Sequence, residues 1–254
     1  MENLLVKIFG HIGTVLHGDA AVFDRWRWLR KNLRHGQLHT LDAGCGSGAF
    51  ALYAAKIGNE VVGISFDERN NGVAQARAGI LGFTDARFVT GDLRRLDEFA
   101  SSLGEFDQII CFETIEHILG DRKLIKDLSD LLRPGGRLLL TTPYKHYSKR
   151  LLGDDKVPLS THEDGGHVRW GYTHEELERI FNGAGLSVVR KDYVSGIISQ
   201  LNIVLYRILQ SKINYKIAWG LSFPFRILVV FDSLVTELIG FPHLSVAVVG
   251  EKKT

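Results

Sequence analysis

The sequence is poor in cysteine and lacks the segments that mark exported and membrane-spanning proteins. Only Cys45 and Cys111 occur among 254 residues, which excludes a disulfide framework and fits free thiols in a reducing cytosol. The first 18 residues have no basic stretch, long apolar core or cleavage site of a secretory signal. The longest apolar zone, 215–241, is interrupted by a proline and charged residues, so it is a poor membrane span. We therefore expect a cytoplasmic protein and leave open its contact with a membrane surface.

The sequence also has no excess of charge of either sign, since 31 Lys and Arg stand against 29 Asp and Glu. Proteins that bind nucleic acid gather Lys and Arg on one face, and no basic run or basic–aromatic stripe occurs here. We therefore expect no nucleic-acid partner. With 45% hydrophobic residues the chain can bury a large core, and its length fits a single domain over residues 1–254.

Strand-like and helix-like segments alternate in the core of the chain, residues 37–143. The predicted strands are 38–43, 60–64, 86–92, 106–112 and 137–143, and the predicted helices are 49–58, 68–81 and 121–132. A Pro-Gly-Gly turn separates the last helix from the last of these strands. Such alternation produces βαβ units, so we expect an α/β fold with a mostly parallel sheet and helices on both faces.

Further segments surround this core. Residues 1–36 are predicted to form a helical cap, and 144–172 an active-site loop, because that stretch is long, polar and without a clear period. A helix at 173–185 begins with the pattern of a capping box. Strands are predicted at 186–194 and 244–252. Between these two strands, 195–243 is predicted to be a helical insertion.

A glycine-rich turn follows the first predicted strand, in LDAGCGSGAF at 41–50. Strand, glycines and helix in this order leave the backbone bare where a ligand approaches. Such turns also serve phosphate and dinucleotide sites, but the Asp before the first glycine and the Cys between the glycines differ from the dinucleotide pattern. The turn closely resembles motif I of class I S-adenosylmethionine-dependent methyltransferases.

This resemblance covers residues 38–143 and implies the Rossmann-like fold of that class, with a seven-stranded sheet. It also implies S-adenosylmethionine as the cofactor and S-adenosylhomocysteine as its product. In the family, the glycine-rich turn holds the methionine and ribose portions of the cofactor. The matching residues here are Asp42, Ala43, Gly44 and Gly46.

The ends of the later strands match further landmarks of the family. Ser65 stands where most members have an acidic residue that accepts hydrogen bonds from both ribose hydroxyls. The Ser65 hydroxyl would make one hydrogen bond to the ribose in place of these two. We interpret Asp67 as a helix N-cap. Phe66 is expected on the adenine face or, alternatively, in the core. The remaining cofactor positions implied by the resemblance are Asp92 at the adenine amino group, Leu93 on the ring, and Cys111 and Phe112 at the methionine end.

The stretch CFETIEHI, 111–118, is similar to small-molecule and lipid-quinone methyltransferases of the class. Methyl transfer from a sulfonium is an in-line displacement that depends on alignment and exclusion of water. A general base is needed only where the acceptor must lose a proton. If a helix begins here, Glu113 and His117 share one face, and we predict His117 as the base. The alternative is a local pair that fixes the turn.

The loop at 144–172 is expected to cover the acceptor. Its polar and aromatic side chains make it a candidate for substrate contact, above all Tyr144, His162, His167 and Trp170. HEDGGH at 162–167 lacks the helical spacing of a His-Glu-x-x-His zinc motif and contains two adjacent glycines, so no metal site is predicted.

We predict an enzyme that methylates a small or lipid-like molecule at oxygen or carbon. The alternatives are a protein or nucleic-acid methyltransferase, or a non-catalytic protein that binds the cofactor. An Asn/Asp-Pro-Pro-Tyr motif for N-methylation is absent from the end of the fourth strand. The insertion at 195–243 has two interpretations. It packs on the sheet or on a second copy, giving a monomer or a homodimer, or it forms an apolar channel or a surface that dips into a membrane.

Overall fold

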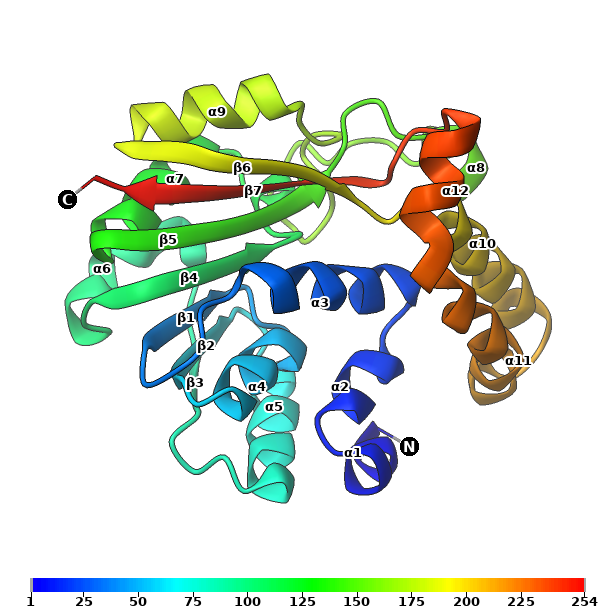
Figure 1. Ribbon diagram of the computed structural model, residues 1–254, viewed down its shortest axis with the longest axis horizontal. Helices are drawn as coiled ribbons and strands as arrows, with labels where there is room; N and C mark the ends of the chain where they lie inside the picture. The colour runs from blue at the N-terminus through cyan, green and yellow to red at the C-terminus, as the bar shows by residue number, and fades with distance from the viewer. Residues whose placement is uncertain (1, 254) are drawn as a thin grey trace.

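The computed structural model describes residues 2–253 and places seven strands in one sheet, in the order β3-β2-β1-β4-β5-β7-β6 (Figure 1). The strands are β1 (His39–Ala43), β2 (Glu60–Ser65), β3 (Arg87–Thr90), β4 (Phe106–Phe112), β5 (Leu132–Pro143), β6 (Leu186–Val194) and β7 (Ser245–Lys252). Only β7 runs antiparallel to its neighbours β5 and β6. The predicted mostly parallel sheet is confirmed, and the carboxyl ends of β1, β2, β4 and β5 meet at one edge.

Helices cover both faces of this sheet, as predicted (Figure 1). One face packs against α3 (Ala20–Asn32), α4 (Ala49–Lys56) and α5 (Glu68–Leu81). The other packs against α6 (Leu96–Phe99), α7 (Asp121–Asp130) and α9 (His174–Gly183). The helix α9 begins with the capping box expected from the sequence, in which Thr173 and Glu176 cap each other's backbone N–H groups.

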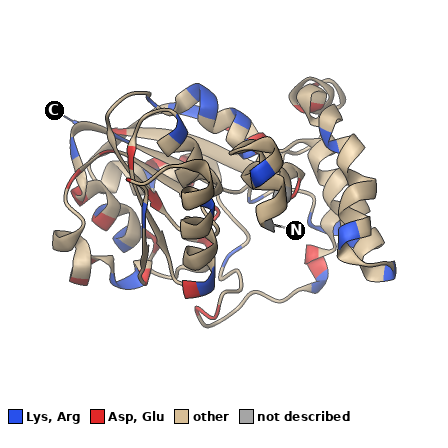
Figure 2. Cartoon of the chain, turned by 90° about the horizontal axis from the view of Figure 1, so that it is seen from below, with Lys and Arg blue, Asp and Glu red and all other residues tan. Residues whose placement is uncertain are grey.

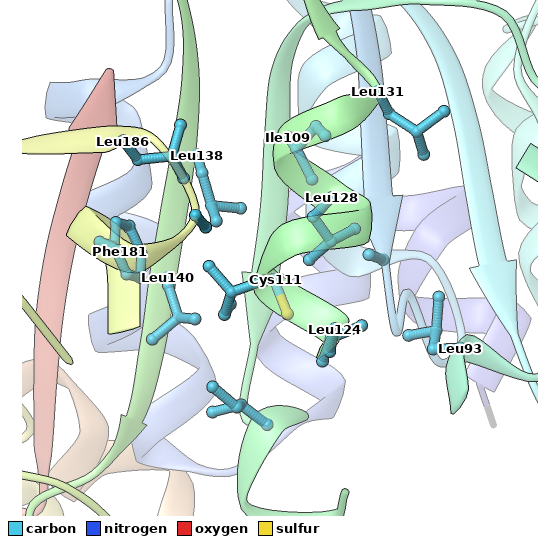
Figure 3. Close-up of a cluster of buried hydrophobic side chains, with 14 of the residues drawn as sticks. Leu93, Ile109, Cys111, Leu124, Leu128, Leu131, Leu138, Leu140, Phe181 and Leu186 are labelled. Atoms are coloured by element: carbon cyan, nitrogen blue, oxygen red, sulfur yellow. The ribbon is translucent and has the colours of Figure 1, made fainter. Parts of the chain in front are cut away.

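The sheet separates two hydrophobic cores, one on each face, and the strand β4 contributes to both. Its side chains alternate, so Ile109 and Cys111 enter the core under α7, whereas Ile110 and Phe112 enter the core over α3 and α4. Figure 3 shows Ile109 and Cys111 between the leucines of α7 and those of β5. A strand buried on both faces needs a continuous apolar run, which the sequence FDQIICF supplies in its second half.

The strand β5 begins earlier than predicted. Leu132 already pairs with Phe106, and the register between β4 and β5 shifts before Gln108. The shift is a bulge that accommodates Pro134 and two glycines inside the strand, where a regular ladder would reject proline. The predicted turn at this place is therefore wrong, and the preceding helix ends at Asp130 rather than at residue 132.

The remaining elements belong to the cap, the long loop, the insertion and the turns of the core. The cap consists of α1 (Glu2–Phe9), α2 (Ile12–His17) and α3, and the loop at 144–172 holds only α8 (Lys149–Leu152) and the short 3-10 turn η4 (Asp154–Lys156). The insertion is formed by α10 (Ile197–Lys212), α11 (Tyr215–Ile227), η5 (Leu228–Phe231) and α12 (Asp232–Ile239). It stands beyond the carboxyl ends of β4 and β5 (Figure 1). Three short 3-10 turns complete the core: η1 (Leu93–Arg95), η2 (Ala100–Ser102) and η3 (Ile115–His117).

Candidate active site

The glycine-rich turn between β1 and α4 leaves its backbone exposed to the carboxyl edge of the sheet. Gly44, Gly46 and Gly48 have φ angles of +92°, +49° and +84°, in the region that favours glycine. A Cβ atom on Gly44 would also lie 2.3 Å from Oγ1 of Thr114. Glycine is therefore required at position 44 for two reasons: its backbone conformation, and the close approach of the chain that follows β4.

Two of the predicted cofactor residues hold this turn from beneath. Asp42 is 1% exposed, and its Oδ2 accepts a hydrogen bond of 2.9 Å from the backbone N–H of Ala51 at the start of α4. Burial raises the pKa of the Asp42 carboxyl to about 7. Ala43 is fully buried in the core. Both side chains point into the protein, so their contribution is to shape the turn.

A cavity of about 400 Å³ opens above the turn, at the size expected for a small-molecule site. It lies where the chain leaves β1, β2, β3 and β4, as sites in open α/β sheets do. Residues 163–165 of the long loop rim it. The other lining residues are Gly44, Phe66, Gly91, Asp92, Leu93, Arg94, Glu113, Thr114, His117 and Ile118. Six of these are predicted site residues: Gly44, Phe66, Asp92, Leu93, Glu113 and His117.

One end of the cavity carries the groups expected around an adenine ring. Phe66 is 73% exposed, so its alternative placement in the core is wrong. The guanidinium of Arg94 lies 5.7 Å from the centre of the Phe66 ring and donates hydrogen bonds to both carboxylate oxygens of Asp92. This pairing lowers the pKa of Asp92. Arg94 also donates to the carbonyl oxygen of Glu163 at 3.1 Å. The sequence analysis missed Arg94, although its place two residues after Asp92 could have suggested the pair.

Ser65 and Asp67 stand apart from the cavity lining. The backbone N–H of Asp67 donates to Oγ of Ser65 at 3.2 Å, and Asn71 donates to the Ser65 carbonyl. Asp67 accepts from the backbone N–H of Arg69 and caps α5, as interpreted from the sequence. A ribose contact from Ser65 stays a prediction, because its hydroxyl is nearly buried and already bonded.

The other end of the cavity differs from the expectation. The predicted helix after β4 is only the 3-10 turn η3, and Glu113 has a left-handed backbone with φ +48°. Glu113 and His117 therefore share no helix face and form no local pair. Oε2 of Glu113 lies 3.0 Å from Nη2 of Arg25 on α3. Nδ1 of His117 lies 3.1 Å from the carbonyl oxygen of Gly166 instead.

A buried carboxylate that the sequence analysis missed lies beside His117. Glu116 is 1% exposed, and one of its oxygens accepts a hydrogen bond of 3.0 Å from Thr142. Burial, followed by the charge of Glu113, raises the pKa of Glu116 well above its usual value. The ring of His167 packs edge-on against that of His117, with centroids 4.7 Å apart. No sequence spacing could have joined Glu116 to a loop residue fifty positions away.

Of the four predicted acceptor contacts, His167 alone approaches the residues of the cavity. His162 is exposed and contacts Thr161. Tyr144 packs against His146 and Tyr193. Trp170 lies under the ammonium group of Lys149. None of Tyr144, His162 and Trp170 belongs to the lining of the cavity.

The side chains of Cys111 and Phe112 are buried in the two cores on either side of β4 and are absent from the lining of the cavity. The contact expected from the sequence involves the backbone around these two residues, and it stays a prediction. Glu113 and Thr114, the first two residues after β4, belong to the lining. Thr114 was missed, and its contact with Gly44 is visible only in three dimensions.

The methyltransferase domain family matches residues 37–191, which is more than half of the chain. The chain belongs to this family. The methyltransferase is 30% identical over 170 residues to the ubiquinone biosynthesis O-methyltransferase of Aromatoleum aromaticum, covering 64% of this chain and 69% of the relative. It is 32% identical over 171 residues to the enzyme of the same name from Ruegeria pomeroyi, covering 64% and 65%. The similarity thus spans about two thirds of each chain.

Solved structures confirm the fold of the methyltransferase. The [4+2]-cyclase SpnF aligns with a TM-score of 0.62 and 17% identity, covering 89% of this chain and 79% of that one. A putative sarcosine dimethylglycine methyltransferase from Galdieria sulphuraria aligns with a TM-score of 0.62 and 14% identity, covering 89% and 84%. At these identities the likeness shows the fold alone, and a cyclase among such structures shows that the fold serves more than one reaction.

The predicted enzyme class and cofactor are confirmed: the chain is an S-adenosylmethionine-dependent methyltransferase. The residues present fit the cofactor. The turn at Gly44 is free of side chains, and Asp92 offers a carboxylate to an amino group. The exposed ring of Phe66 offers a flat apolar face to a purine.

Proposed function

We propose that this methyltransferase methylates a hydroxyl oxygen on a small molecule with an apolar tail. The observation that carries the proposal is the end of the cavity beside Thr114, where His117 and Glu113 lie together in its lining. Ionisable groups are needed there when the acceptor must lose a proton, as a phenol must. The relatives from Aromatoleum aromaticum and Ruegeria pomeroyi are O-methyltransferases by name, which supports oxygen as the acceptor atom.

The groups around the cavity have distinct tasks in this reaction. S-adenosylmethionine, when bound, supplies a methyl group on a sulfonium that leaves as a neutral thioether. Gly44 and Thr114 position the donor, and residues 163–165 exclude water from it. The acceptor oxygen forms the new bond to the methyl carbon as the carbon–sulfur bond breaks. The hydroxyl proton passes to His117 or Glu113.

A surface on the insertion supports an apolar acceptor. The amphipathic stretch α11–α12 turns its polar side inward, where Arg226, Asp232 and Thr236 are each at most 4% exposed. Asp232 accepts hydrogen bonds from three backbone N–H groups at the start of α10. The apolar side chains exposed instead are Phe225, Ile227, Leu228, Val230, Phe231, Leu234, Leu238 and Ile239, which we call the apolar arm surface. Water disfavours a continuous patch of this kind, and such patches mark interaction sites.

By length and composition, Tyr215–Ile239 is apolar enough to cross a membrane, which by itself is weak evidence. Its buried polar groups favour another arrangement. Arg226 donates to the carbonyl oxygens of Leu16 and Gly18, which ties α11 to the N-terminal cap. Figure 2 shows few charged residues on the helices of the insertion. We propose that the apolar arm surface rests on a membrane from the cytoplasmic side, while its polar side stays on the protein.

The lining of the cavity contains no residue from 195–243, and the long loop rims it instead. This favours an acceptor whose compact polar end enters the cavity while its tail stays outside. The apolar channel expected beneath the insertion is not needed for such a molecule. The membrane then serves as the store from which the acceptor is taken.

Two dihydroxybenzenes, one with a polyprenyl tail and one without, test this proposal with radiolabelled S-adenosylmethionine and lipid vesicles. We expect transfer to oxygen, with a kcat/KM at least about tenfold higher for the tailed acceptor in vesicles, since each buried methylene is worth about 0.8 kcal/mol. Equal rates for the two would contradict the apolar acceptor. Label on carbon or nitrogen would contradict the acceptor atom.

Variants of the apolar arm surface test the membrane contact. Leu234→Asp with Leu238→Asp should abolish sedimentation with vesicles and leave transfer to the tailless acceptor unchanged. Val189→Asp is the matched control, because Val189 is also exposed, at 52%, but lies on β6. Equal sedimentation of the double variant and of Val189→Asp would contradict the membrane contact. If the double variant instead splits a dimer in vesicle-free buffer, the apolar arm surface binds a second copy of the chain.

A further inference from the structure

A second cavity, of about 520 Å³, lies apart from the cofactor cavity and shares none of its lining residues. Its walls come mainly from the starts of α7 and α8, from residues 169–172 of the long loop and from α9. Five lining residues are cations and two are carboxylates, so three positive charges are in excess there, against +2 for the whole chain. The cations are Arg122, Lys145, Lys149, Arg169 and Arg179. A cavity of this size and charge is suited to an anionic small molecule.

Both carboxylates of this second cavity are already paired. Oδ2 of Asp121 lies 3.2 Å from Nη1 of Arg169 and accepts a hydrogen bond of 2.9 Å from the hydroxyl of Tyr172. Glu176 binds the ammonium group of Lys145. Two of the five cations, Arg169 and Lys145, are therefore balanced by the protein itself.

The other three cations have no carboxylate partner. Within the part of the chain that the structure describes, the guanidinium groups of Arg122 and Arg179 make no hydrogen bond or ion pair. The ammonium group of Lys149 lies 4.6 Å from the centre of the Trp170 ring and likewise has no described carboxylate within 4.0 Å. Like charges around one concave cavity repel each other, and their summed field attracts an anion. The second cavity therefore suits a ligand that carries two or three negative charges.

The same lining has an apolar part, formed by Leu159, Trp170 and Ile180. Trp170 was predicted to contact the acceptor, but it is absent from the lining of the cofactor cavity and lines the second cavity instead. An indole ring is a flat apolar surface on which another planar group can stack. The combination of cations and an aromatic ring favours a ligand with an anionic end and a planar apolar body.

Arg169 connects the second cavity with the wall of the first. Its guanidinium group donates to the carbonyl oxygens of Ile118 at 2.7 Å and of Leu119 at 3.0 Å. Ile118 lines the cofactor cavity, and residues 163–165 of the same loop rim it. A ligand that binds residues 169–172 in this conformation also favours the loop position that covers the cofactor. By linkage, such a ligand and the cofactor raise each other's affinity.

We propose that the second cavity binds a soluble organic phosphate, with the phosphate group at Arg122, Lys149 and Arg179 and a planar apolar body on Trp170. Arginine donates two parallel hydrogen bonds to phosphate oxygens, and lysine binds them as a point charge. A phosphate monoester carries close to two negative charges at neutral pH, which matches the unpaired cations. The ligand is separate from the cofactor and from the acceptor, so this site does not depend on which atom is methylated.

The probe is naphthyl phosphate, titrated by calorimetry into the whole protein saturated with S-adenosylhomocysteine. We expect one site per chain. Naphthol, which lacks the charge, and inorganic phosphate, which lacks the ring, should each bind at least about tenfold more weakly.

Variants of the lining locate the probe. Arg122→Gln with Arg179→Gln should weaken the binding of naphthyl phosphate at least about tenfold, because both guanidinium groups lose their charge. Trp170→Leu should weaken the binding of naphthyl phosphate and leave that of inorganic phosphate unchanged. Arg150→Gln is the matched control, since Arg150 is an exposed arginine of α8 outside the lining of both cavities. It should bind naphthyl phosphate like the parent.

The affinity for S-adenosylhomocysteine, measured in every variant without the probe, separates loss of the second site from loss of fold. The proposal is overturned if the parent binds S-adenosylhomocysteine but not naphthyl phosphate, or if Arg150→Gln weakens probe binding as much as the double variant does. It is also overturned if the double variant loses binding to anionic lipid vesicles and keeps that to naphthyl phosphate, because the cations then serve a membrane.

The link between the two cavities has its own readout. S-adenosylhomocysteine should bind the parent at least about threefold more tightly in the presence of naphthyl phosphate, and the double variant should lose this gain. An affinity that naphthyl phosphate does not change would overturn the coupling through Arg169.

Discussion

Arg25 on the N-terminal cap and Glu113 after β4 form an ion pair, with Nη2 3.0 Å from Oε2. The pair lies where Glu113 adopts a left-handed backbone, which costs a non-glycine residue about 1–3 kcal/mol. The backbone N–H of Glu113 also donates to the carbonyl of Thr141 at 2.8 Å. These contacts hold Glu113 in the wall of the cavity, so the cap takes part in building the site.

Replacement of Arg25 tests that coupling. Arg25→Met should lower the free energy of unfolding by about 1–3 kcal/mol, because the carboxylate of Glu113 loses its cation in a largely buried place. Chemical denaturation measures the change. Lys126→Met is the control, since it removes an exposed helical pair with Asp130 worth at most about 0.5 kcal/mol. Equal losses of unfolding free energy in the two variants would show that the Arg25–Glu113 pair stabilises the protein no more than an exposed pair does.

Asp92 is predicted to bind the adenine end of the cofactor. Asp92→Ala should weaken S-adenosylhomocysteine binding by about 10–100-fold, since a hydrogen bond to a charged group is worth about 1.5–3 kcal/mol. Arg94→Met removes the cation that holds the same carboxylate and should weaken binding less. Calorimetric titration compares the two. If Arg94→Met has the larger effect, Asp92 acts mainly as the partner of Arg94.

His117 is predicted to act in the transfer step and not in cofactor binding. His117→Ala should leave the affinity for S-adenosylhomocysteine within about twofold and lower kcat by roughly 10²–10⁴-fold, the range of a lost general acid–base group. Steady-state kinetics with the phenolic acceptor measures this. Unchanged turnover would show that His117 is not the base.

Asp42 gives a prediction on pH. Its pKa rises from 3.8 to about 7 on folding, so between these values the folded state binds a proton that the unfolded state lacks. The contribution of Asp42 to stability is therefore greatest below pH 4 and falls as the pH rises to about 7, by up to about 4 kcal/mol. Asp42→Asn keeps an oxygen for the N–H of Ala51 but does not titrate. The difference in unfolding free energy between the two proteins should follow this slope, and parallel profiles would contradict it.

The order of elements was predictable because it depends on local patterns. The apolar run of β4, the glycines at 44–48 and the capping box at Thr173 each act within a few residues, and each lies where expected. The conformation after β4 was not predictable. The residue types in ETIEHI favour a helix. The structure instead pairs Glu113 with Arg25, which lies almost ninety residues earlier in the chain, so no local pattern could reveal the contact.

The same limit applies to the loop and the insertion. His167 meets Glu116 and His117 only because the loop folds back onto η3. The sequence predicted that the insertion is helical, but not that a polar side of its helices faces inward. That orientation follows from Asp232, which binds the start of α10.

The central claim is that the turn at Gly44 holds the cofactor in the cavity beneath residues 163–165. Titration of S-adenosylhomocysteine into the parent protein and into Gly44→Ala tests it most directly, with Gly220→Ala, on an exposed turn of α11 far from the cavity, as the control. The added methyl group would lie 2.3 Å from Oγ1 of Thr114 at a backbone φ of +92°. We expect one site per chain in the parent and in Gly220→Ala, and at least about a tenfold loss, or 1.4 kcal/mol, in Gly44→Ala. Binding of equal strength in Gly44→Ala would place the cofactor elsewhere.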